Sequence, residues 1–501
     1  MIFPSEKEFF QLTKLGNLIP VYREILGDLE TPVSAYLKLS HGSSYSFLLE
    51  SVEGEEKIAR YSFLAKDPEL VLETKGHRAF LIKRSGGKTK REEWTMEGSP
   101  LDFLRGLMAK YQPVEVKGLP RFCGGFVGSI GYDVVRFYER LPDEPVDDLG
   151  LPDMIMMLTK KLVIFDQCHH KIKIVVCAHI DHNMSRQKKS AIYRQALKQI
   201  EAMAQELRRP LPVPKIHQRA ALPRLAKSNV TRRQFLDNVK NAKKKIKAGD
   251  IIQVVISQRF QVPVSTEPID IYRRLRTLNP SPYMYYLHFD DINIIGSSPE
   301  PLLRCEGGTV ETRPIAGTRR RGLNDQEDEQ LMKELMNDPK EKAEHIMLVD
   351  LGRNDLGRVC EKGSVTISEF MTIEKYSHVM HIVSHVKGRL RRNKDSLDAF
   401  MAAFPAGTVS GAPKIRAMEI IDELENRKRG PYAGCIGYIG FSGNLDTCIT
   451  IRTIIVVKDK AYIQAGAGIV ADSVPEKEYQ ETINKARAQI LAIEMAHQSE
   501  P

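Results

Sequence analysis

Residues 433–470 read AGCIGYIGFSGNLDTCITIRTIIVVKDKAYIQAGAGIV, and this stretch decides the predicted fold. Its β-branched and aromatic runs are separated by short turns, which predicts several strands in succession without intervening helices. A helical pattern of apolar residues follows, at Tyr479, Ile483, Ala486, Ile490 and Ile493. Strands that bunch rather than alternate with helices favour an α+β fold over a doubly wound sheet. We recognise no internal repeat in the sequence.

The domain organisation is predicted by working outward from this run. Residues 172–180 form a predicted strand that pairs with 162–166 across a turn, and a helical pattern runs from Ile192 to Leu207. A Pro-rich, basic stretch without periodicity then follows, and the next helix has Thr231 as its N-cap and Gly249 as its stop. We therefore predict a lobe at 1–205, a linker at 206–227 and a second lobe at 228–497.

Composition excludes several classes of protein. The chain has 501 residues, of which 42% are hydrophobic and 28% charged, so disordered and fibrous classes are excluded. Its seven cysteines include no CxxC pair, which argues against a disulfide framework or a structural zinc site. Neither a secretory signal nor a stretch of membrane-spanning length is present. We expect a cytoplasmic protein that does not associate with membranes.

The net charge of +10 is concentrated in one segment. Residues 186–249 contain eighteen Lys and Arg against three Asp and Glu, a net of +15, so the remainder of the chain is net acidic. Because this segment lacks interleaved aromatic residues and a recognisable reading module, we expect no nucleic-acid partner. Two interpretations stay open, a solvated connector or part of a surface that docks a partner.

Two glycine-rich motifs look like functional loops but lack the required spacing. The segment from Gly124 to Gly131 does not follow GxGxxG, so a tight turn or close packing is the better interpretation. Cys435 resembles the nucleophile of a hydrolase elbow, but the segment continues as a strand instead of turning into a helix. We predict a buried structural Cys435 and no thiol glutaminase centre in this chain.

Acidic pairs on two predicted helices form a candidate metal site. Glu341 and Glu344 are three residues apart, and Glu478, Glu481 and Lys485 share a helix face apart from its apolar stripe. Carboxylates on two helices could hold Mg²⁺, although solvated helix faces are the plainer interpretation. Three loops rich in Pro and Gly, and Arg452 in a strand predicted at 449–457, would suit a substrate with several carboxylates.

Eight segments of the second lobe together resemble the chorismate-utilising enzymes, most closely the large subunits of anthranilate synthases. They are DIIQVVISQRF (250–260), NPSPYMYYL (279–287), GSSPE (296–300), TRPIAGTRRRG (312–322), EHIMLVDLGRNDLGRV (344–359), YSHVMHIVSHVKG (376–388), FPAGTVSGAPK (404–414) and QAGAGIVADSVPEKEYQET (464–482). LLES (48–51), RYSF (60–63) and GGFVGSIGYD (124–133) extend the resemblance into the first lobe. It implies antiparallel sheets packed as a sandwich, helices on the outside and two interlocked lobes.

Two residues discriminate within that family. Aminodeoxychorismate synthases, the alternative assignment, typically carry a nucleophilic Lys where this chain has Ala316. Isochorismate and salicylate synthases use a Lys to activate water at the position of Gln253, and a neutral amide is a poor base. The resemblance therefore implies direct addition of ammonia to chorismate, giving anthranilate and pyruvate in tryptophan biosynthesis.

The resemblance also assigns roles to individual residues. The metal would be Mg²⁺, with Glu344 and Glu481 as ligands and Glu341 and Glu478 in an outer position. The residues implied in catalysis are His381, Glu300, Thr408, Gln253 and Lys485. Those implied in substrate binding are Tyr432, Arg452, Gly466, Ala467, Gly468, Ala316, Gly317 and Thr318.

Regulation and partners are further implications of the resemblance. A tryptophan feedback site would be formed by Leu49, Glu50, Ser51, Pro282, Tyr283 and Met284, with Glu50 and Ser51 at the polar end of the amino acid. Ammonia would come from a separate glutamine amidotransferase subunit, component II of these synthases, in a heterotetramer.

Overall fold

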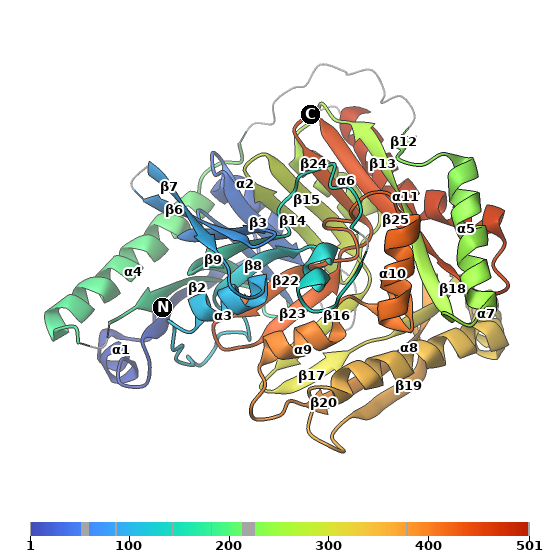
Figure 1. Ribbon diagram of the computed structural model, residues 1–501. Helices are drawn as coiled ribbons and strands as arrows, with labels where there is room; N and C mark the ends of the chain where they lie inside the picture. The colour runs from blue at the N-terminus through green and yellow to red at the C-terminus, as the bar shows by residue number, and fades with distance from the viewer. Residues whose placement is uncertain are drawn as a thin grey trace.

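Two antiparallel β-sheets packed face to face form the centre of the molecule, and helices cover their outer faces (Figure 1). The computed structural model describes residues 2–51, 60–85, 88–142, 144–181, 183–212, 226–376 and 379–498. The predicted α+β class and the sandwich of antiparallel sheets are confirmed. In the described ranges, no helix is long and apolar enough to cross a membrane.

The first sheet has 13 strands in the described part of the chain. Along the sheet they run β1 (Ile2–Phe3), β2 (Leu18–Leu26), β11 (Lys171–His179), β10 (Lys161–Asp166), β4 (Tyr61–Lys66), β3 (Tyr45–Glu50), β14 (Tyr283–Phe289), β15 (Ile292–Ser298), β24 (Thr453–Val457), β25 (Lys460–Ile469), β13 (Gln253–Pro263) and β12 (Lys227–Ser228), while β21 (Gly411–Ala412) also pairs with β13. The predicted hairpin of β10 and β11 is confirmed.

The second sheet has 12 described strands. They run β18 (Ile315–Arg320), β20 (Val379–Arg389), β17 (Thr309–Thr312), β16 (Pro301–Glu306), β23 (Leu445–Ile449), β22 (Cys435–Gly440), β8 (Gly125–Ile130), β9 (Met154–Thr159), β5 (Leu70–Lys75), β6 (Arg78–Ser85) and β7 (Lys88–Thr95), with β19 (Thr366–Lys375) paired to β20. Apolar side chains from both sheets, such as Phe47, Tyr285 and Val127, fill the space between them.

Helices cover both outer faces, and apolar residues pack beneath them. On the first sheet the main covering helices are α2 (Pro32–Ser40), α4 (Arg186–Leu207), α6 (Pro268–Leu278) and α11 (Pro475–Gln498). The other helices are α1 (Glu6–Leu12), α3 (Pro100–Met108), α5 (Arg232–Lys247), α7 (Asp325–Asn337), α8 (Pro339–Gly357), α9 (Ser396–Ala403), α10 (Lys414–Leu424) and the short turns η1 (Tyr132–Phe137) and η2 (Gly407–Val409). The predicted N-cap of α5 at Thr231 is confirmed.

The strand order shows an internal repeat that the sequence analysis did not recognise. The first sheet reads β2-β11-β10-β4-β3 and then, in mirrored order, β14-β15-β24-β25-β13. In the second sheet β17-β16-β23-β22 is followed by β8-β9-β5-β6 in the same way. Each half of the chain therefore builds one half of each sheet, and the halves are related by an approximate two-fold axis. The second half inserts β18, α7, α8 and β19 between β17 and β20, and this insertion obscures the repeat in the sequence.

The axis passes between β8 and β22, where the two glycine motifs pair with each other. GFVGSIGY (125–132) and GCIGYIGF (434–441) share three glycines and an isoleucine at equal spacing, and Gly128 lies directly opposite Gly437. A Cβ atom added at Gly128 would lie 2.0 Å from the carbonyl oxygen of Ile155. One added at Gly437 would lie 2.2 Å from the carbonyl oxygen of Asp446. Close packing therefore explains these glycines, and Cys435 is a buried strand residue as predicted.

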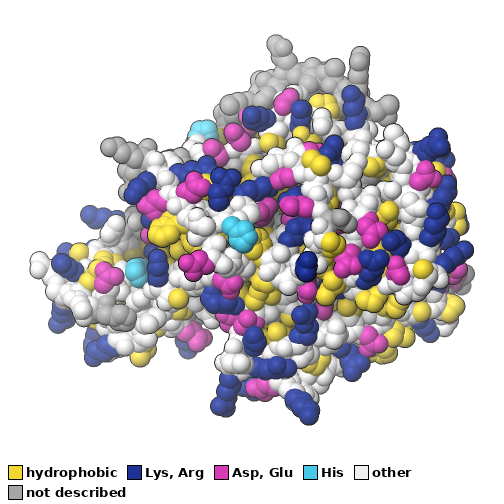
Figure 2. Space-filling view, in the orientation of Figure 1, with side chains coloured by type: hydrophobic (Ala, Val, Ile, Leu, Met, Phe, Trp, Pro, Cys, Tyr) yellow, Lys and Arg dark blue, Asp and Glu magenta, His cyan; other side chains and the backbone are white. Residues whose placement is uncertain are grey.

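The predicted lobe boundary remains untested, because both sheets contain strands from 1–205 and from 228–497. The predicted linker at 206–227 falls largely on residues 213–225, which lie outside the described residues. The basic helices on either side of it, α4 and α5, lie on opposite sides of the molecule in Figure 1. In Figure 2 many Lys and Arg side chains line the edge occupied by α5. The described part of the basic segment is thus divided between two surfaces.

Replacing Gly128 with Ala should destabilise the protein strongly. The new methyl group would meet a backbone oxygen that cannot move without disturbing β9, so we expect a loss at or above the upper end of about 1–3 kcal/mol. Urea unfolding followed by circular dichroism measures the change. Gly106→Ala in α3 is the control, because open space surrounds that site, and it should stabilise by about 0.5–1 kcal/mol. Equal stability of both variants would contradict the packing argument.

Candidate active site

A cavity of about 560 Å³ in the second half gathers most of the predicted site residues. It lies where the sheets meet the inserted helix α8 and the C-terminal helix α11. All four predicted metal carboxylates contribute to its lining. Its predicted members are Gln253, Glu300, Ala316, Gly317, Thr318, Glu341, Glu344, His381, Thr408, Tyr432, Arg452, Gly466, Gly468, Glu478, Glu481 and Lys485.

Ala467 is the one predicted substrate-binding residue that does not line the cavity. Successive side chains of a strand point to opposite faces, so Ala467 faces away while its neighbours Gly466 and Gly468 face the cavity. Its methyl group is fully buried in a core shared with α5 and α10. The structure therefore leaves only the backbone of Ala467 near the site.

Gly466 and Gly468 are glycines because two other site residues lie directly over them. A Cβ atom would lie 2.7 Å from the Tyr432 hydroxyl at Gly466 and 2.7 Å from Gln253 Nε2 at Gly468. Tyr432 and Gln253 are both nearly buried, and the Gln253 carbonyl oxygen has no hydrogen-bond partner in the described structure. A polar group of a ligand could complete the bonding of this carboxamide.

Glu300 and Arg452 reach the cavity from two places where the chain passes from one sheet to the other. Glu300 lies between β15 of the first sheet and β16 of the second, and Arg452 lies between β23 and β24. The prediction of a single strand at 449–457 is therefore wrong, because β23 ends at Ile449 and β24 begins at Thr453. Arg452 adopts a left-handed backbone with φ of 52°, which lets the chain turn between the sheets. Its guanidinium donates to the carbonyl oxygen of Lys485 at 2.6 Å.

Glu300 has the electrostatics of a general acid. Desolvation raises the pKa of its carboxyl group to about 7, and the nearby Thr408 hydroxyl and Lys485 ammonium only partly offset this effect. At neutral pH a substantial fraction of Glu300 therefore carries a proton. A carboxylic acid with a pKa near the working pH is well matched to proton donation.

His381 on β20 is held in one orientation by the backbone of β18. Its Nδ1 lies 3.0 Å from the Gly317 carbonyl oxygen and 3.1 Å from the Thr318 hydroxyl. Desolvation lowers the pKa of the imidazole, so the neutral form predominates at pH 7. Because a carbonyl oxygen can only accept, Nδ1 carries the hydrogen and Nε2 keeps its lone pair.

The carboxylates of α8 and α11 line the same cavity, where Lys340 and Lys485 offset only part of the negative charge around Glu344. Desolvation raises the pKa of Glu344, and the negative charges of Glu341 and Glu481 raise it further. Glu344 has no ion pair or hydrogen bond within the described ranges. Lys485 donates to Glu481 at 2.6 Å and to the Gly466 carbonyl oxygen at 3.0 Å. The cavity thus contains an excess of acid that a cation would neutralise.

Mg²⁺ fits this set of donors. Among the described residues, no group of three or more His, Cys, Asp or Glu side chains closes around one metal position. Mg²⁺ does not require such a cage, because it usually binds through one or two carboxylates and completes its shell with water and substrate oxygens. Two carboxylates at the edge of a substrate-sized cavity match that preference.

Gln489 and Lys340 are among the lining residues that sequence reasoning missed. Gln489 is completely buried, and neither polar atom of its carboxamide has a partner in the described structure. It lies one turn beyond Lys485 on the face that carries Glu478 and Glu481, so extending that helical pattern would have found it. Lys340 is the second, and its charge lowers the pKa of Glu344 and Glu478.

A buried ion pair behind the cavity supports several of these residues. Arg429 is 3% exposed and Glu425 is 8% exposed. The guanidinium of Arg429 donates to the Glu425 carboxylate through Nε and one Nη. Its Nη atoms also donate to the carbonyl oxygens of Val409 and Val255. The guanidinium also lies 5.5 Å from the ring centre of Tyr432. The pair therefore joins β13, the η2 turn that carries Thr408, and Tyr432.

A second cavity, of about 820 Å³, contains all six residues predicted for tryptophan feedback. Leu49, Glu50 and Ser51 come from the first half, and Pro282, Tyr283 and Met284 come from the second, beside the two-fold axis. The Glu50 carboxylate is bonded to Tyr272 and Arg276 of α6, on the helix-covered side of the sheet. Ser51 is the residue whose hydroxyl has no partner among the described residues.

Comparisons with known proteins show which proteins this chain resembles. The profile of the family described as chorismate binding enzyme matches residues 45–491. Proteins named anthranilate synthase component 1 from Acetivibrio thermocellus and Aquifex aeolicus are 50% and 48% identical to this chain, with 99% of each chain covered. The structure of anthranilate synthase component I from Streptococcus pneumoniae TIGR4 has a TM-score of 0.76 at 39% identity, covering 93% of this chain and 99% of that chain. MenF, an isochorismate synthase of Escherichia coli, shares the fold, with a TM-score of 0.68 at 19% identity over 97% of this chain and 98% of its own.

Arg429→Met should destabilise the protein by about 3–5 kcal/mol, because it leaves the Glu425 carboxylate buried without its partner. Urea unfolding measures this loss. The double variant Arg429→Met with Glu425→Leu removes both charges and should recover a large part of the stability. A single variant as stable as the parent would refute the supporting role of the pair.

Proposed function

The chain belongs to the chorismate-binding enzymes and, among them, to the anthranilate synthase component 1 proteins, and we propose how its site makes anthranilate and pyruvate from chorismate and ammonia. It is thus a lyase of tryptophan biosynthesis. The observation that carries the proposal is that Ala316 and Gln253 both line the cavity. Ala316 cannot act as a nucleophile, and Gln253 is too weak a base to activate water. The nucleophile would therefore be ammonia that enters the cavity. Aminodeoxychorismate synthase, which relies on a Lys at the position of Ala316, is not favoured.

Glu344 and Glu481 would hold Mg²⁺, with Glu341 and Glu478 nearby. The bound ion would act as a Lewis acid toward the ring carboxylate of chorismate and withdraw electron density from the ring. Arg452, the Tyr432 hydroxyl and the backbone of Gly466 and Gly468 would hold the carboxylate of the enolpyruvyl group. Lys485 and Thr408, which both lie near Glu300, would also contact the substrate.

The proposal includes two proton transfers, which the positions of Glu300 and His381 in the cavity support. Ammonia adds at C2 of the ring, and the C4 hydroxyl leaves as water after accepting a proton from Glu300, while the added nitrogen releases a proton to become a neutral amine. The proton at C2 is then removed as the bond between C3 and the enolpyruvyl oxygen breaks, which makes the ring aromatic. The released enolpyruvate takes up a proton at its methylene carbon and becomes pyruvate. We assign His381 to the removal of the proton at C2, since its neutral Nε2 can accept a proton while Gly317 fixes the ring.

The remaining features of the proposal concern regulation and assembly. The 820 Å³ cavity would bind tryptophan as a feedback inhibitor, with the Ser51 hydroxyl as its free polar contact. Coupling to the active site has a physical route, because Pro299 lines both cavities. A glutamine amidotransferase subunit would supply ammonia, in a cytoplasmic heterotetramer.

The function is tested by incubating the purified chain with chorismate, Mg²⁺ and ammonium and following anthranilate fluorescence. We expect product with ammonium and none when glutamine replaces it, because this chain would lack a glutaminase centre. Product from glutamine alone would refute the need for a partner. Accumulation of 4-amino-4-deoxychorismate instead of anthranilate would refute the assignment itself.

Glu344→Gln and Glu481→Gln should each reduce the rate of anthranilate formation at least 100-fold at any Mg²⁺ concentration, since a neutral amide is a much weaker magnesium ligand. The rate is measured as a function of added Mg²⁺. Glu476→Gln, in the first turn of the same helix as Glu481 but outside the cavity, is the matched control and should keep the parent's magnesium dependence. Full activity in either of the two site variants would contradict the metal assignment.

Activity should also fall as the pH rises through about 7, because the pKa of Glu300 is raised to about 7 and only its protonated form can donate. Glu300→Gln should lower kcat by about 10²–10⁴ and abolish this limb of the pH profile. Glu69→Gln, at the equivalent crossing of the other half, serves as the control and should leave the profile unchanged. A Glu300→Gln variant with the parent's pH profile would exclude Glu300 as the acid.

A further inference from the structure

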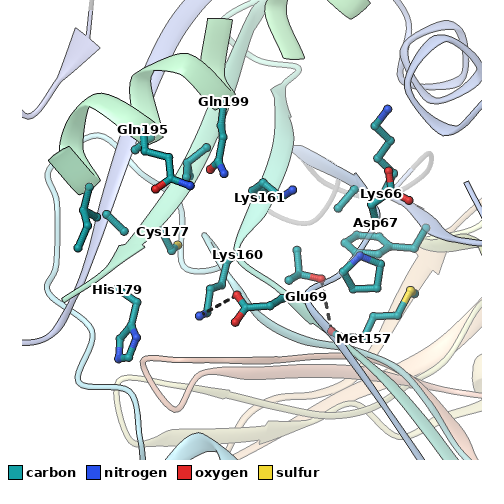
Figure 3. A pocket seen from close by; sticks show the side chains of 18 residues that line it. Lys66, Asp67, Glu69, Met157, Lys160, Lys161, Cys177, His179, Gln195 and Gln199 are labelled. Carbon is teal, nitrogen blue, oxygen red and sulfur yellow. Dashed lines mark hydrogen bonds and ion pairs between the residues drawn. The ribbon is translucent and has the colours of Figure 1, made fainter. Parts of the chain in front are cut away.

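A polar pocket of about 530 Å³ lies in the first half, at the position that the two-fold axis relates to the candidate active site (Figure 3). Its lining comes from the crossing between β4 and β5, the crossing between β9 and β10, the end of β11 and one face of α4. The elements that correspond to these in the second half are the β15–β16 and β23–β24 crossings, β25 and α11. The mechanism above does not use this pocket.

Individual residues correspond at both crossings. Pro68 and Glu69 lie directly before β5. In the same way, Pro299 and Glu300 lie directly before β16. A basic residue precedes the next crossing strand in both halves, Lys160 before β10 and Arg452 before β24. The first pocket therefore has the same acid and the same type of cation at the junction of the two sheets.

The strand and the helix that complete the pocket also correspond. KIKIVVCAHI (171–180) aligns with KAYIQAGAGI (460–469), which places Cys177 and His179 at the positions of Gly466 and Gly468. On α4, Gln195 and Gln199 line the first pocket, as Lys485 and Gln489 on α11 line the candidate active site. In Figure 3 both glutamines extend from α4 toward Lys160 and Lys161.

The two pockets differ where the metal site would be. In the same alignment Lys189 and Ile192 of α4 replace Glu478 and Glu481, and the described first half has no counterpart of α8 with Glu341 and Glu344. The first pocket therefore lacks the carboxylates that could hold a divalent cation. A negatively charged ligand there would have to be bound by the side chains of the protein itself.

Lys160 is placed to bind such a ligand. Its side chain is 12% exposed, and its ammonium pairs at 2.9 Å with Glu69, whose side chain is 61% exposed. The ammonium also lies 4.8 Å from the ring centre of Tyr111. An ion pair with so exposed a carboxylate contributes little to stability, so another anion can replace Glu69 at small cost.

Further polar groups line the same pocket without partners of their own. Within the described ranges, the ammonium of Lys161, the imidazole of His179 and the carboxamides of Gln195 and Gln199 make no hydrogen bond or ion pair. Apolar side chains, among them Val176, Ile192 and Ala196, complete the lining beside them. The pocket thus offers cations and hydrogen-bond donors next to an apolar surface, in a volume close to that of the candidate active site.

We propose that this pocket binds a small cyclic carboxylate of about the size of the substrate, without a metal ion. Lys160 holds the carboxylate in place of Glu69, Gln195 and Gln199 donate to its other oxygens, and the ring packs on the apolar face of α4. This site is distinct from the active site and from the cavity at the two-fold axis, and it does not depend on the proposed function.

Salicylate is a suitable probe, because it is a fluorescent cyclic monocarboxylate. The full chain, carrying Arg452→Gln to weaken binding in the active site, is titrated without Mg²⁺ by equilibrium dialysis. We expect one saturable equivalent of salicylate per chain. An equal concentration of inorganic phosphate should not displace it, and displacement would overturn the claim that the pocket selects a carboxylate with a ring.

Three further substitutions in that background locate the bound probe. Lys160→Met should weaken binding at least tenfold, and Gln195→Leu, at an exposed helix position, should weaken it several-fold. Lys198→Met on the same helix is the matched control, because it removes one charge outside the pocket, and its affinity should equal that of the parent. Melting temperatures verify that each variant folds. If Lys160→Met does not fold, the affinity of Gln195→Leu decides the outcome. Salicylate affinity that is unaffected by both pocket substitutions overturns the proposal.

Discussion

The buried pair of Arg429 and Glu425 is the interaction on which the candidate active site depends. Its guanidinium satisfies carbonyl oxygens of β13 and of the η2 turn, and it lies against the rings of Tyr432 and, in the first half, Tyr132. Burying two charges is costly, and the additional hydrogen bonds offset that cost only when the geometry is fixed. The pair therefore sets the distance between three elements that each contribute a residue to the cavity. A hydrophobic pair of equal volume could fill the space, but it could not hold these backbone groups in register.

The candidate active site combines an architecture that both halves share with an insertion found in the second half. Glu300, Arg452, Gly466, Glu481 and Lys485 come from elements that have counterparts in the first half. The residues that face them, Ala316 to Thr318 together with Glu341 and Glu344, come from the insertion between β17 and β20. The inserted helix thus adds a second wall with acidic side chains to a polar junction between two sheets. The first half shows the same junction without that insertion, and its pocket carries lysines and amides instead.

Much of this arrangement could be predicted from the sequence, where local chemistry decides the structure. Thr231 and Gly249 bound α5 because capping is a local property, and the helical spacing of Glu478, Glu481 and Lys485 correctly placed them on one face. The left-handed turn at Arg452 could not be predicted, because the point at which a chain leaves one sheet for another depends on distant packing. Glu425 and Arg429 are four residues apart and look like an ordinary surface pair until the fold buries them. The two-fold repeat was missed because an insertion interrupts one copy and few identical residues remain.

The seam between the halves has a consequence for how this protein can be divided. β3 pairs with β14 and β8 pairs with β22, so each sheet is continuous only when both halves are present. A fragment ending in the linker would leave two central strands, rich in buried apolar residues, as open edges with unpaired backbone groups. Such edges invite pairing with other chains. The protein is therefore indivisible at the place where its sequence looks most easily cut, and synthesis of the second half must be complete before either sheet can close.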